Sequence, residues 1–297
     1  MKTRLKPVSD QVMVITGASS GIGLATALMA SEGGARLVLI ARSGETLEDI
    51  RGGLRDLGSE AIVCPADVAD REALEAAARK AVERWGRIDT WVNDAGVSIY
   101  GRLDQVSDED NRRLFETNFW GTVNGSLVAL PYLRRQGGAL INVGSEVSDA
   151  VIPLQGMYAA SKHAVKGFTD ALRVESELVD KAPVEIVLIQ PTAVDTPYPQ
   201  HAANYMAEEP KLPTPMIEPE DVAEAILKAA EEGGRDIKVG AMSKMNTLTS
   251  KLAPSLGDRL SAMQAGRQQR DTSATRDRDG ALYRASEDGR THGTPNL

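Results

Sequence analysis

Short apolar runs alternate with longer stretches of helical character over most of the chain. Seven runs predict buried strands, at residues 12–16, 36–40, 61–64, 89–93, 138–144, 184–190 and 236–239. The stretches between them predict helices, at residues 24–32, 45–57, 70–85, 111–132, 158–180 and 220–232. Because strands and helices alternate, the pattern predicts an α/β fold, a doubly wound parallel sheet of about seven strands with helices on both faces.

A glycine-rich turn follows the first predicted strand and leads directly into the first predicted helix. Gly17 permits the tight turn, Gly21 lets a pyrophosphate approach the backbone, and Gly23 lets the helix pack closely on the strand. The amides of the first helical turn would point at the phosphates. With the second strand this makes a βαβ unit of about 30 residues, so the sequence predicts a Rossmann-like dinucleotide site.

The end of the second predicted strand bears on the choice of cofactor. NAD selectivity commonly rests on an acidic residue at this place, which accepts from the ribose 2′-hydroxyl. The chain has Arg42 there, with no carboxylate beside it. Its guanidinium can form two hydrogen bonds to a 2′-phosphate. NADP(H) is therefore favoured, with NAD(H) as the alternative cofactor and a solvated surface arginine as the alternative interpretation.

Other polar residues follow the later strands. Asp67 comes after the third strand, residues 93–96 end the fourth, and Ser145 follows the fifth. In open α/β sheets ligands lie beyond the carboxyl ends of the strands. These residues are therefore expected to form one site with the glycine turn.

Tyr158 and Lys162 stand four residues apart at the start of a predicted helix. Residues at this spacing share a helix face, so both side chains can reach one site. An ammonium nearby favours phenolate over phenol, and Lys162 is therefore expected to lower the pKa of Tyr158 from about 10. Such a tyrosine can exchange a proton with a substrate oxygen. Taken alone, such a pair is more typical of an ordinary helix surface, and the other motifs of the chain decide for a functional site.

These motifs, in this order, resemble those of the short-chain dehydrogenase/reductase family. Residues 16–23 are similar to its cofactor signature, Asp67 and Val68 to its adenine-contacting pair, and residues 191–196 to its segment beside the nicotinamide. The four catalytic residues of the family correspond to Asn118, Ser145, Tyr158 and Lys162. The resemblance covers about residues 10 to 240 and implies a catalytic domain at 1–240.

The resemblance implies hydride transfer between nicotinamide C4 and a carbinol or carbonyl carbon. Tyr158 would be the acid in reduction and the base in oxidation, and Ser145 would hydrogen-bond the substrate oxygen. Lys162 would also hold the nicotinamide ribose. Asn118 would hold a water that links Lys162 to solvent; the alternative is a mid-helix Asn bonded to nearby backbone. The expected cofactor contacts are Gly17, Ser19, Ser20, Gly21, Ile22, Gly23, Arg42, Asp67, Val68, Asn93, Ala95, Gly96, Tyr158, Lys162, Pro191, Val194 and Thr196, of which Val194 and Thr196 would orient the carboxamide.

The chain departs from the family pattern at two positions. Asp94 stands where the family often has Asn, and Thr192 stands where it often has Gly. Threonine adds bulk and disfavours positive φ. The floor of the substrate pocket is therefore expected to have a different shape.

Charge and composition exclude several classes of protein. The net charge is −8 and no basic cluster stands out, which argues against a nucleic-acid partner. Cys64 is the single cysteine and ends an apolar run, so a buried structural role is expected. The three histidines, His163, His201 and His292, show no metal-ligand spacing. With no signal peptide and no apolar run of about 18 residues, a cytoplasmic protein without an integral membrane segment is expected.

Two segments outside the predicted sheet concern the substrate and possible partners. Residues 197–219 are rich in proline and predict a substrate lid or, alternatively, a surface loop. The side chains that would wall a mostly apolar pocket are Tyr198, Tyr205 and Met206 of this segment with Val147, Pro153, Gln155 and Met157. Apolar residues recur every three or four positions from 242 to 263, interrupted at Pro254. This predicts a helical extension at 241–265 that packs on the body, on a neighbouring subunit or on a membrane surface.

Residues 266–297 are polar and predict either an ordered strap or a flexible tail. The resemblance further implies a homodimer or homotetramer. The sequence as a whole predicts an NADP(H)-dependent oxidoreductase for a small, largely apolar alcohol or ketone. The alternatives are a 3-oxoacyl-thioester reductase and a non-catalytic NADP(H) sensor, and the complete catalytic set argues against the sensor.

Overall fold

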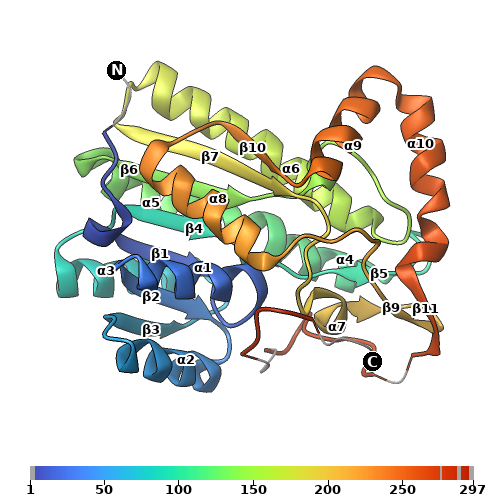
Figure 1. The fold of residues 1–297 in the computed structure, drawn as a ribbon, viewed down its shortest axis with the longest axis horizontal. Coiled ribbons are helices and arrows are strands. Elements are labelled where there is room, and N and C mark those ends of the chain that lie inside the picture. The colour runs from blue at the N-terminus through green and yellow to red at the C-terminus, as the bar shows by residue number, and fades with distance from the viewer. Residues whose placement is uncertain (1–3, 275, 286–288, 294–297) are drawn as a thin grey trace.

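A parallel sheet forms the centre of the computed structural model, which describes residues 4–274, 276–285 and 289–293. Its strands are β1 (Val12–Thr16), β2 (Arg36–Ala41), β3 (Ala61–Pro65), β4 (Thr90–Asn93), β6 (Gly138–Val143), β7 (Val184–Pro191) and β10 (Asp236–Val239). They run parallel in the order β10-β7-β6-β4-β1-β2-β3 (Figure 1). The predicted α/β, Rossmann-like doubly wound sheet is confirmed.

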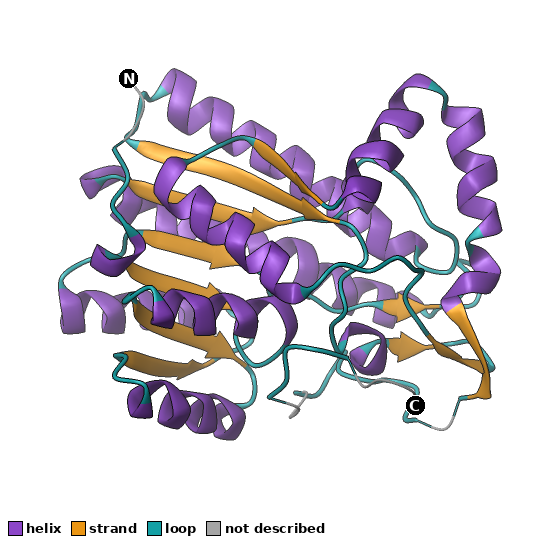
Figure 2. Ribbon diagram, viewed as in Figure 1, coloured by secondary structure: helices purple, strands orange, loops and turns teal. Residues whose placement is uncertain are grey.

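Helices cover both faces of the sheet, as Figure 2 shows. One face packs against α1 (Gly21–Glu32), α2 (Gly44–Asp56) and α8 (Pro219–Glu232). The other packs against α3 (Arg71–Trp85), α5 (Gly121–Gln136) and α6 (Gly156–Arg173). The central strands are mainly apolar, as expected for strands whose two faces are both buried. Cys64 lies in this core, where burial raises the pKa of its thiol, in agreement with a structural role.

The helix predicted at 111–132 is longer than expected and contains a π-helical turn. It comprises α4 (Asp108–Phe115), the turn Glu116–Trp120 and α5. Asn118 lies in the π-helical turn, a feature that recurs at functional sites. The helix predicted at 158–180 likewise comprises α6 and a π-helical turn, Val174–Val179. Among the described residues, no helix is long and apolar enough to cross a bilayer.

Short elements surround the carboxyl ends of the strands. The predicted lid contains α7 (Tyr198–His201), β8 (Ala203–Asn204) and β9 (Glu208–Pro210). β8 pairs with β5 (Ile99–Tyr100), and β9 pairs with β11 (Gln269–Ser273). Residues 197–219 are therefore tied both to the body and to the C-terminal part of the chain.

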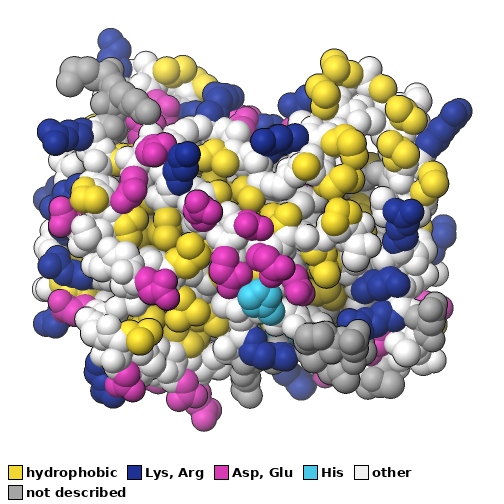
Figure 3. All heavy atoms as spheres, in the orientation of Figure 1, with side chains coloured by type: hydrophobic (Ala, Val, Ile, Leu, Met, Phe, Trp, Pro, Cys, Tyr) yellow, Lys and Arg dark blue, Asp and Glu magenta, His cyan; other side chains and the backbone are white. Residues whose placement is uncertain are grey.

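Residues 241–263 form two helices, α9 (Ala241–Leu252) and α10 (Pro254–Met263), which meet at the predicted break. The polar side of α9 faces the body, because Ser243 is buried and donates a hydrogen bond to Gln190 O at 2.8 Å. The apolar side chains point outward instead, and Leu252 is 76% exposed. Figure 3 shows the resulting patch of hydrophobic atoms over both helices. Of the alternatives predicted for this apolar side, packing on the body is not observed, and packing on a neighbouring subunit or on a membrane surface stays a prediction.

Candidate active site

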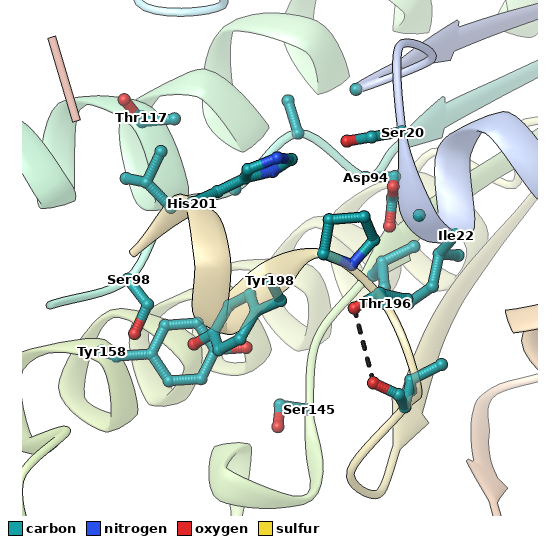
Figure 4. Close-up of a pocket in the computed structure, with 18 of the residues that line it drawn as sticks. Ser20, Ile22, Asp94, Ser98, Thr117, Ser145, Tyr158, Thr196, Tyr198 and His201 are labelled. Carbon is teal, nitrogen blue, oxygen red and sulfur yellow. Dashed lines mark hydrogen bonds between the residues drawn. The ribbon is translucent and has the colours of Figure 1, made fainter. Parts of the chain in front are cut away.

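An elongated cleft of about 240 Å³ lies at the carboxyl ends of the strands. Most of the predicted site residues line it, and Figure 4 shows several of them converging on one space. They are Gly17, Ser19, Ser20, Gly21, Ile22, Arg42, Asp67, Val68, Ala95, Gly96, Ser145, Tyr158, Lys162, Pro191, Val194 and Thr196. Residues from every part of the first 200 positions are thus brought together because parallel strands end at the same edge.

Gly23 and Asn93 were expected to contact the cofactor, and neither lines the cleft. A Cβ at Gly23 would lie 2.3 Å from the Gly17 carbonyl oxygen, so Gly23 serves the close packing of α1 on the glycine turn. Asn93 is buried, accepts from Trp91 Nε1 at 2.9 Å and donates to Asn142 Oδ1 at 2.8 Å. It therefore connects β4 to β6 behind the cleft.

The loop after β4 reaches the cleft through the next three residues. The N–H groups of Asp94 and Ala95 both donate to Thr16 Oγ1, at 3.1 and 3.2 Å. Thr16 is the last residue of β1, so its hydroxyl fixes the β4 loop against the glycine turn. Asp94, Ala95 and Gly96 then line the cleft.

Tyr158 lies in the first turn of α6, beside Ser145 and Tyr198 (Figure 4). Its ring packs edge-to-face on the ring of Tyr198, with centroids 5.5 Å apart. Burial raises the pKa of Tyr158 to about 12, although hydrogen bonding with the hydroxyls of Tyr198 and Ser145 acts in the opposite direction. The phenol is therefore protonated at neutral pH.

Lys162 lies one helical turn beyond Tyr158, with its Nζ 5.7 Å from the centroid of the tyrosine ring. The ammonium donates to Val143 O at 2.8 Å and is buried. Burial lowers the pKa of Lys162, and the carboxylate of Asp94 opposes that shift. The pKa of Tyr158 is therefore raised overall and not lowered as expected, because burial of the phenol dominates.

Asn118 lies behind the cleft and is fully buried. Its side chain accepts from Val97 N–H at 2.8 Å and donates to Val97 O at 2.9 Å and to Ser161 Oγ at 3.1 Å. These bonds hold the segment after β4 and the first turns of α6 in a fixed relation. A Cβ at Gly96 would lie 3.5 Å from Asn118 Oδ1 and 3.9 Å from Lys162 Nζ, so both polar groups approach the same point.

Arg42 and Asp67 line the far end of the cleft, and Arg113 contacts Asp67 from outside it. Arg113 forms an ion pair with Asp67. Burial alone would raise the pKa of Asp67, but hydrogen bonds from the Ala69 N–H and from Arg113 lower it overall. Burial lowers the pKa of Arg42, with the charge of Asp67 acting against it.

Glu146 is a site residue that the sequence interpretation missed. It lines the cleft next to Ser145, accepts from Thr192 Oγ1 at 3.1 Å and from Asn246 Nδ2 at 2.9 Å. Burial raises the pKa of its carboxyl, although these two hydrogen bonds lower it. Thr192, which stands where the family often has Gly, thus donates a hydrogen bond to the Glu146 carboxyl. Asn246 of α9 donates to the same carboxyl and so links this pair to the helix.

The predicted pocket wall is only partly correct. Tyr198, Val147 and Gln155 line the cleft, as expected. Tyr205 and Met206 do not, and the Tyr205 hydroxyl donates to Asp110 instead, at 2.6 Å. Pro153 and Met157 were also expected in the wall, and neither lines the cleft. His201, Leu212 and Pro213 complete the wall, together with Ala281 and Ala285 from the C-terminal segment.

Comparison with known proteins identifies the family. The model of the short chain dehydrogenase family matches residues 11–206. This chain belongs to the short-chain dehydrogenase family. The resemblance drawn from the motifs is confirmed, and the chain is an oxidoreductase of that family.

Relatives of this family chain include the uncharacterized oxidoreductase YxnA of Bacillus subtilis, 46% identical over 87% of this chain and 73% of the relative. Among solved structures, an alcohol dehydrogenase from Thermococcus sibiricus complexed with 5-hydroxy-NADP is 30% identical with a TM-score of 0.67, covering 77% of this chain and 94% of that one. A short chain dehydrogenase from Burkholderia cenocepacia in complex with NADP is 25% identical with a TM-score of 0.71, covering 86% and 99%.

Proposed function

We propose that this oxidoreductase uses NADP(H) to reduce the carbonyl group of a small, largely apolar ketone to an alcohol. The observation that carries the proposal is the convergence of Tyr158, Ser145 and Lys162 on one end of a cleft whose other end carries Arg42. The two solved relatives that hold NADP or a derivative of it support the choice of cofactor. Tyr158, Ser145 and Lys162, at the end of the cleft away from Arg42, support carbonyl reduction.

The residues along the cleft fit a nicotinamide dinucleotide. The N-terminus of α1 lines the cleft with Ile22, where helix amides and the helix dipole suit a pyrophosphate, whereas the Gly21 N–H itself donates to Arg290 O. Arg42 lies at the end of β2, the position that reads the ribose 2′ substituent. Val194 and Thr196 lie near Gly21, on the side that would hold the nicotinamide carboxamide. A bound NADPH supplies the hydride.

The protein's own residues supply the proton and stabilise the new charge. Tyr158 is protonated at neutral pH, which is the form that donates to a carbonyl oxygen. The Ser145 hydroxyl stands beside it as a second donor to the developing alkoxide. Lys162 lies one turn away, and its ammonium stabilises the phenolate that forms once Tyr158 has given up its proton. In our proposal Asn118 positions this group rather than touching substrate, because its side-chain atoms bond to Val97 and Ser161.

The test is cofactor oxidation measured with NADPH and with NADH across ketones, aldehydes, quinones and 3-oxoacyl thioesters. We expect turnover of apolar ketones with NADPH. Tyr158→Phe should lower kcat by at least 10²-fold, because it removes the general acid, while NADPH binding measured by fluorescence stays within about twofold. Tyr132→Phe, on the distant helix α5, is the matched control and should retain activity.

Each other outcome points to a different function. Turnover limited to thioesters would make the protein a 3-oxoacyl-thioester reductase. Tight NADPH binding with no turnover of any substrate would make it a sensor. Full activity of the Tyr158→Phe protein would refute the role given to that residue.

A further inference from the structure

The C-terminal strap, defined as the described residues 276–285 and 289–293, contacts the cleft at separate places. Ala281 and Ala285 line the cleft. The Arg290 carbonyl accepts a hydrogen bond from the N–H of Gly21 at 2.9 Å, at the start of α1. Figure 1 shows this red segment passing from α7 toward α1. The strap therefore contacts both the Arg42 end of the cleft and the glycine turn.

Two large side chains of the strap, Leu282 and Tyr283, contact the body, while two small ones line the cleft. Leu282 is fully buried in a cluster with Val97, Ile99 and Leu114. The next residue, Tyr283, donates from its hydroxyl to Asp110 Oδ1 at 2.7 Å. The strap residues that line the cleft are Ala281 and Ala285, whose side chains are small, so the strap bounds the cavity without filling it.

The strap also fixes the side chain of Arg42. Arg42 Nη2 donates to Ala281 O at 2.5 Å, and Nη1 donates to Leu282 O at 3.2 Å. Arg113 Nε donates to the same Leu282 carbonyl at 3.1 Å. A guanidinium has five N–H donors, so both carbonyls can be satisfied while others remain for a ligand.

The charge of Arg42 is not neutralised by these contacts. Its two acceptors are neutral carbonyls, and within the described ranges no carboxylate forms an ion pair with it. Asp67, the nearby acid, is paired with Arg113. Arg42 feels the charge of Asp67 but forms no ion pair with it, and a guanidinium fixed in this way is preorganised for an anion such as a phosphate.

We propose that the C-terminal strap is the outer wall of the cofactor site, where it positions Arg42 for the 2′-phosphate and closes over the bound dinucleotide. This inference rests on the proposed function, because it assigns NADP(H) to the cleft. The strap is held at both ends, by Leu282 and at Gly21, so the cofactor leaves only when one end lifts. It therefore slows cofactor release and favours NADPH over NADH.

The experiment is Leu282→Asp in the full-length chain, which places a carboxylate in the apolar anchor and frees this end of the strap. Stopped-flow displacement should show NADPH release at least tenfold faster than in the wild type. The Kd for NADPH should rise at least tenfold, and the Kd for NADH less than threefold, since NADH has no 2′-phosphate for Arg42. Leu252→Asp makes the same change at a side chain that is 76% exposed on α9, and should leave both cofactors unaffected.

A measurement on the wild-type protein guards against a variant that misfolds. The Ala281 N–H donates to His201 O at 2.7 Å, and its hydrogen exchange should slow when NADPH is added. Faster exchange, or tighter NADPH binding by Leu282→Asp, would mean that the strap blocks the site and would overturn the proposal. Unchanged release and affinity in Leu282→Asp would also overturn it. If the wild type binds neither dinucleotide, the proposed function fails instead.

Discussion

Asp94 and Lys162 are residues of opposite charge type that both line the cleft beside Tyr158, the proton donor in our proposal. Burial raises the pKa of Asp94, and the charge of Lys162 opposes this. Burial lowers the pKa of Lys162, and the charge of Asp94 opposes this in turn. The carboxylate also contributes to the raised pKa of Tyr158, after the larger effect of burial. We therefore propose that Asp94 tunes the acidity of Tyr158, the proton donor in the proposed reaction.

We predict that Asp94→Asn moves the pH dependence of the reaction. Removing the negative charge stabilises the phenolate, so the pKa of Tyr158 falls. The pH at which alcohol oxidation reaches half of its maximum should shift to lower pH, measured as kcat/KM between pH 6 and 11. Asp56→Asn, at an exposed position on α2, should leave the profile unchanged. A shift to higher pH in Asp94→Asn would contradict this account.

Several corrections at this scale have one cause. Gly23 and Asn93 were expected to contact the cofactor, yet neither lines the cleft, because Gly23 packs on the Gly17 backbone and the Asn93 side chain bonds behind the cleft. Spacing along the chain predicts which residues lie near the site, because strand ends converge. The direction of each side chain depends on its packing partners, such as Asn142 for Asn93.

Asp149 connects several elements at the base of the C-terminal helices. It follows the 3₁₀ turn after β6, and its carboxylate accepts from Gln190 of β7 at 2.8 Å. It also pairs with Lys238 of β10 and with Lys251 of α9, the latter at 3.3 Å. Burial by itself would raise the pKa of Asp149. The hydrogen bonds from Lys238 and Gln190, with that from Lys238 the stronger, lower this pKa to about 2.

We predict that Asp149→Asn lowers the free energy of unfolding by roughly 2 kcal/mol at pH 7, from the difference between about 2 and the ordinary pKa near 3.9. Because the folded-state pKa is depressed, this stabilisation is present above about pH 4 and is lost as the pH falls toward about 2. Urea denaturation at pH 7 and at pH 3 measures the difference, which should shrink at pH 3. Asp104→Asn, on the exposed surface, should change stability by less than about 0.5 kcal/mol.

The C-terminal helices show how polar contacts can decide the orientation of an element. The apolar positions of α9 and α10 form a regular pattern, but Ser243, Asn246 and Lys251 bond to the body. These bonds hold the polar side inward and leave Met245, Leu248 and Leu252 exposed. Periodicity alone predicts the helices and their break at Pro254, and it does not reveal which side faces the body.

At the scale of the whole molecule, cofactor binding should stabilise the fold. The cleft joins loops from β1, β2, β4, β6 and β7 with the C-terminal strap, so a ligand that contacts all of them binds only the folded state. At a hundred times its Kd, NADPH should add about 2.7 kcal/mol to the free energy of unfolding.

We therefore predict that saturating NADPH raises the Tm by about 5–10 °C, since each kcal/mol shifts the Tm by about 2–4 °C in proteins of this size class. Differential scanning calorimetry measures the shift. NADH at the same concentration should give a smaller one, because Arg42 then lacks its phosphate partner. An unchanged Tm with both cofactors would show that the cleft does not hold a nicotinamide dinucleotide.

The sequence by itself determined the α/β sheet, the order of strands and helices, the glycine turn and most of the residues at the strand ends. These features are local or periodic, and parallel strands necessarily bring their carboxyl ends to one edge. Only the tertiary structure decided that Arg42 bonds to Ala281 and Leu282 and that Glu146 bonds to Thr192 and Asn246. It also decided that the apolar side of α9 faces away from the body. Such contacts join residues from about 50 to 240 positions apart, and no local pattern records which distant partner a side chain meets.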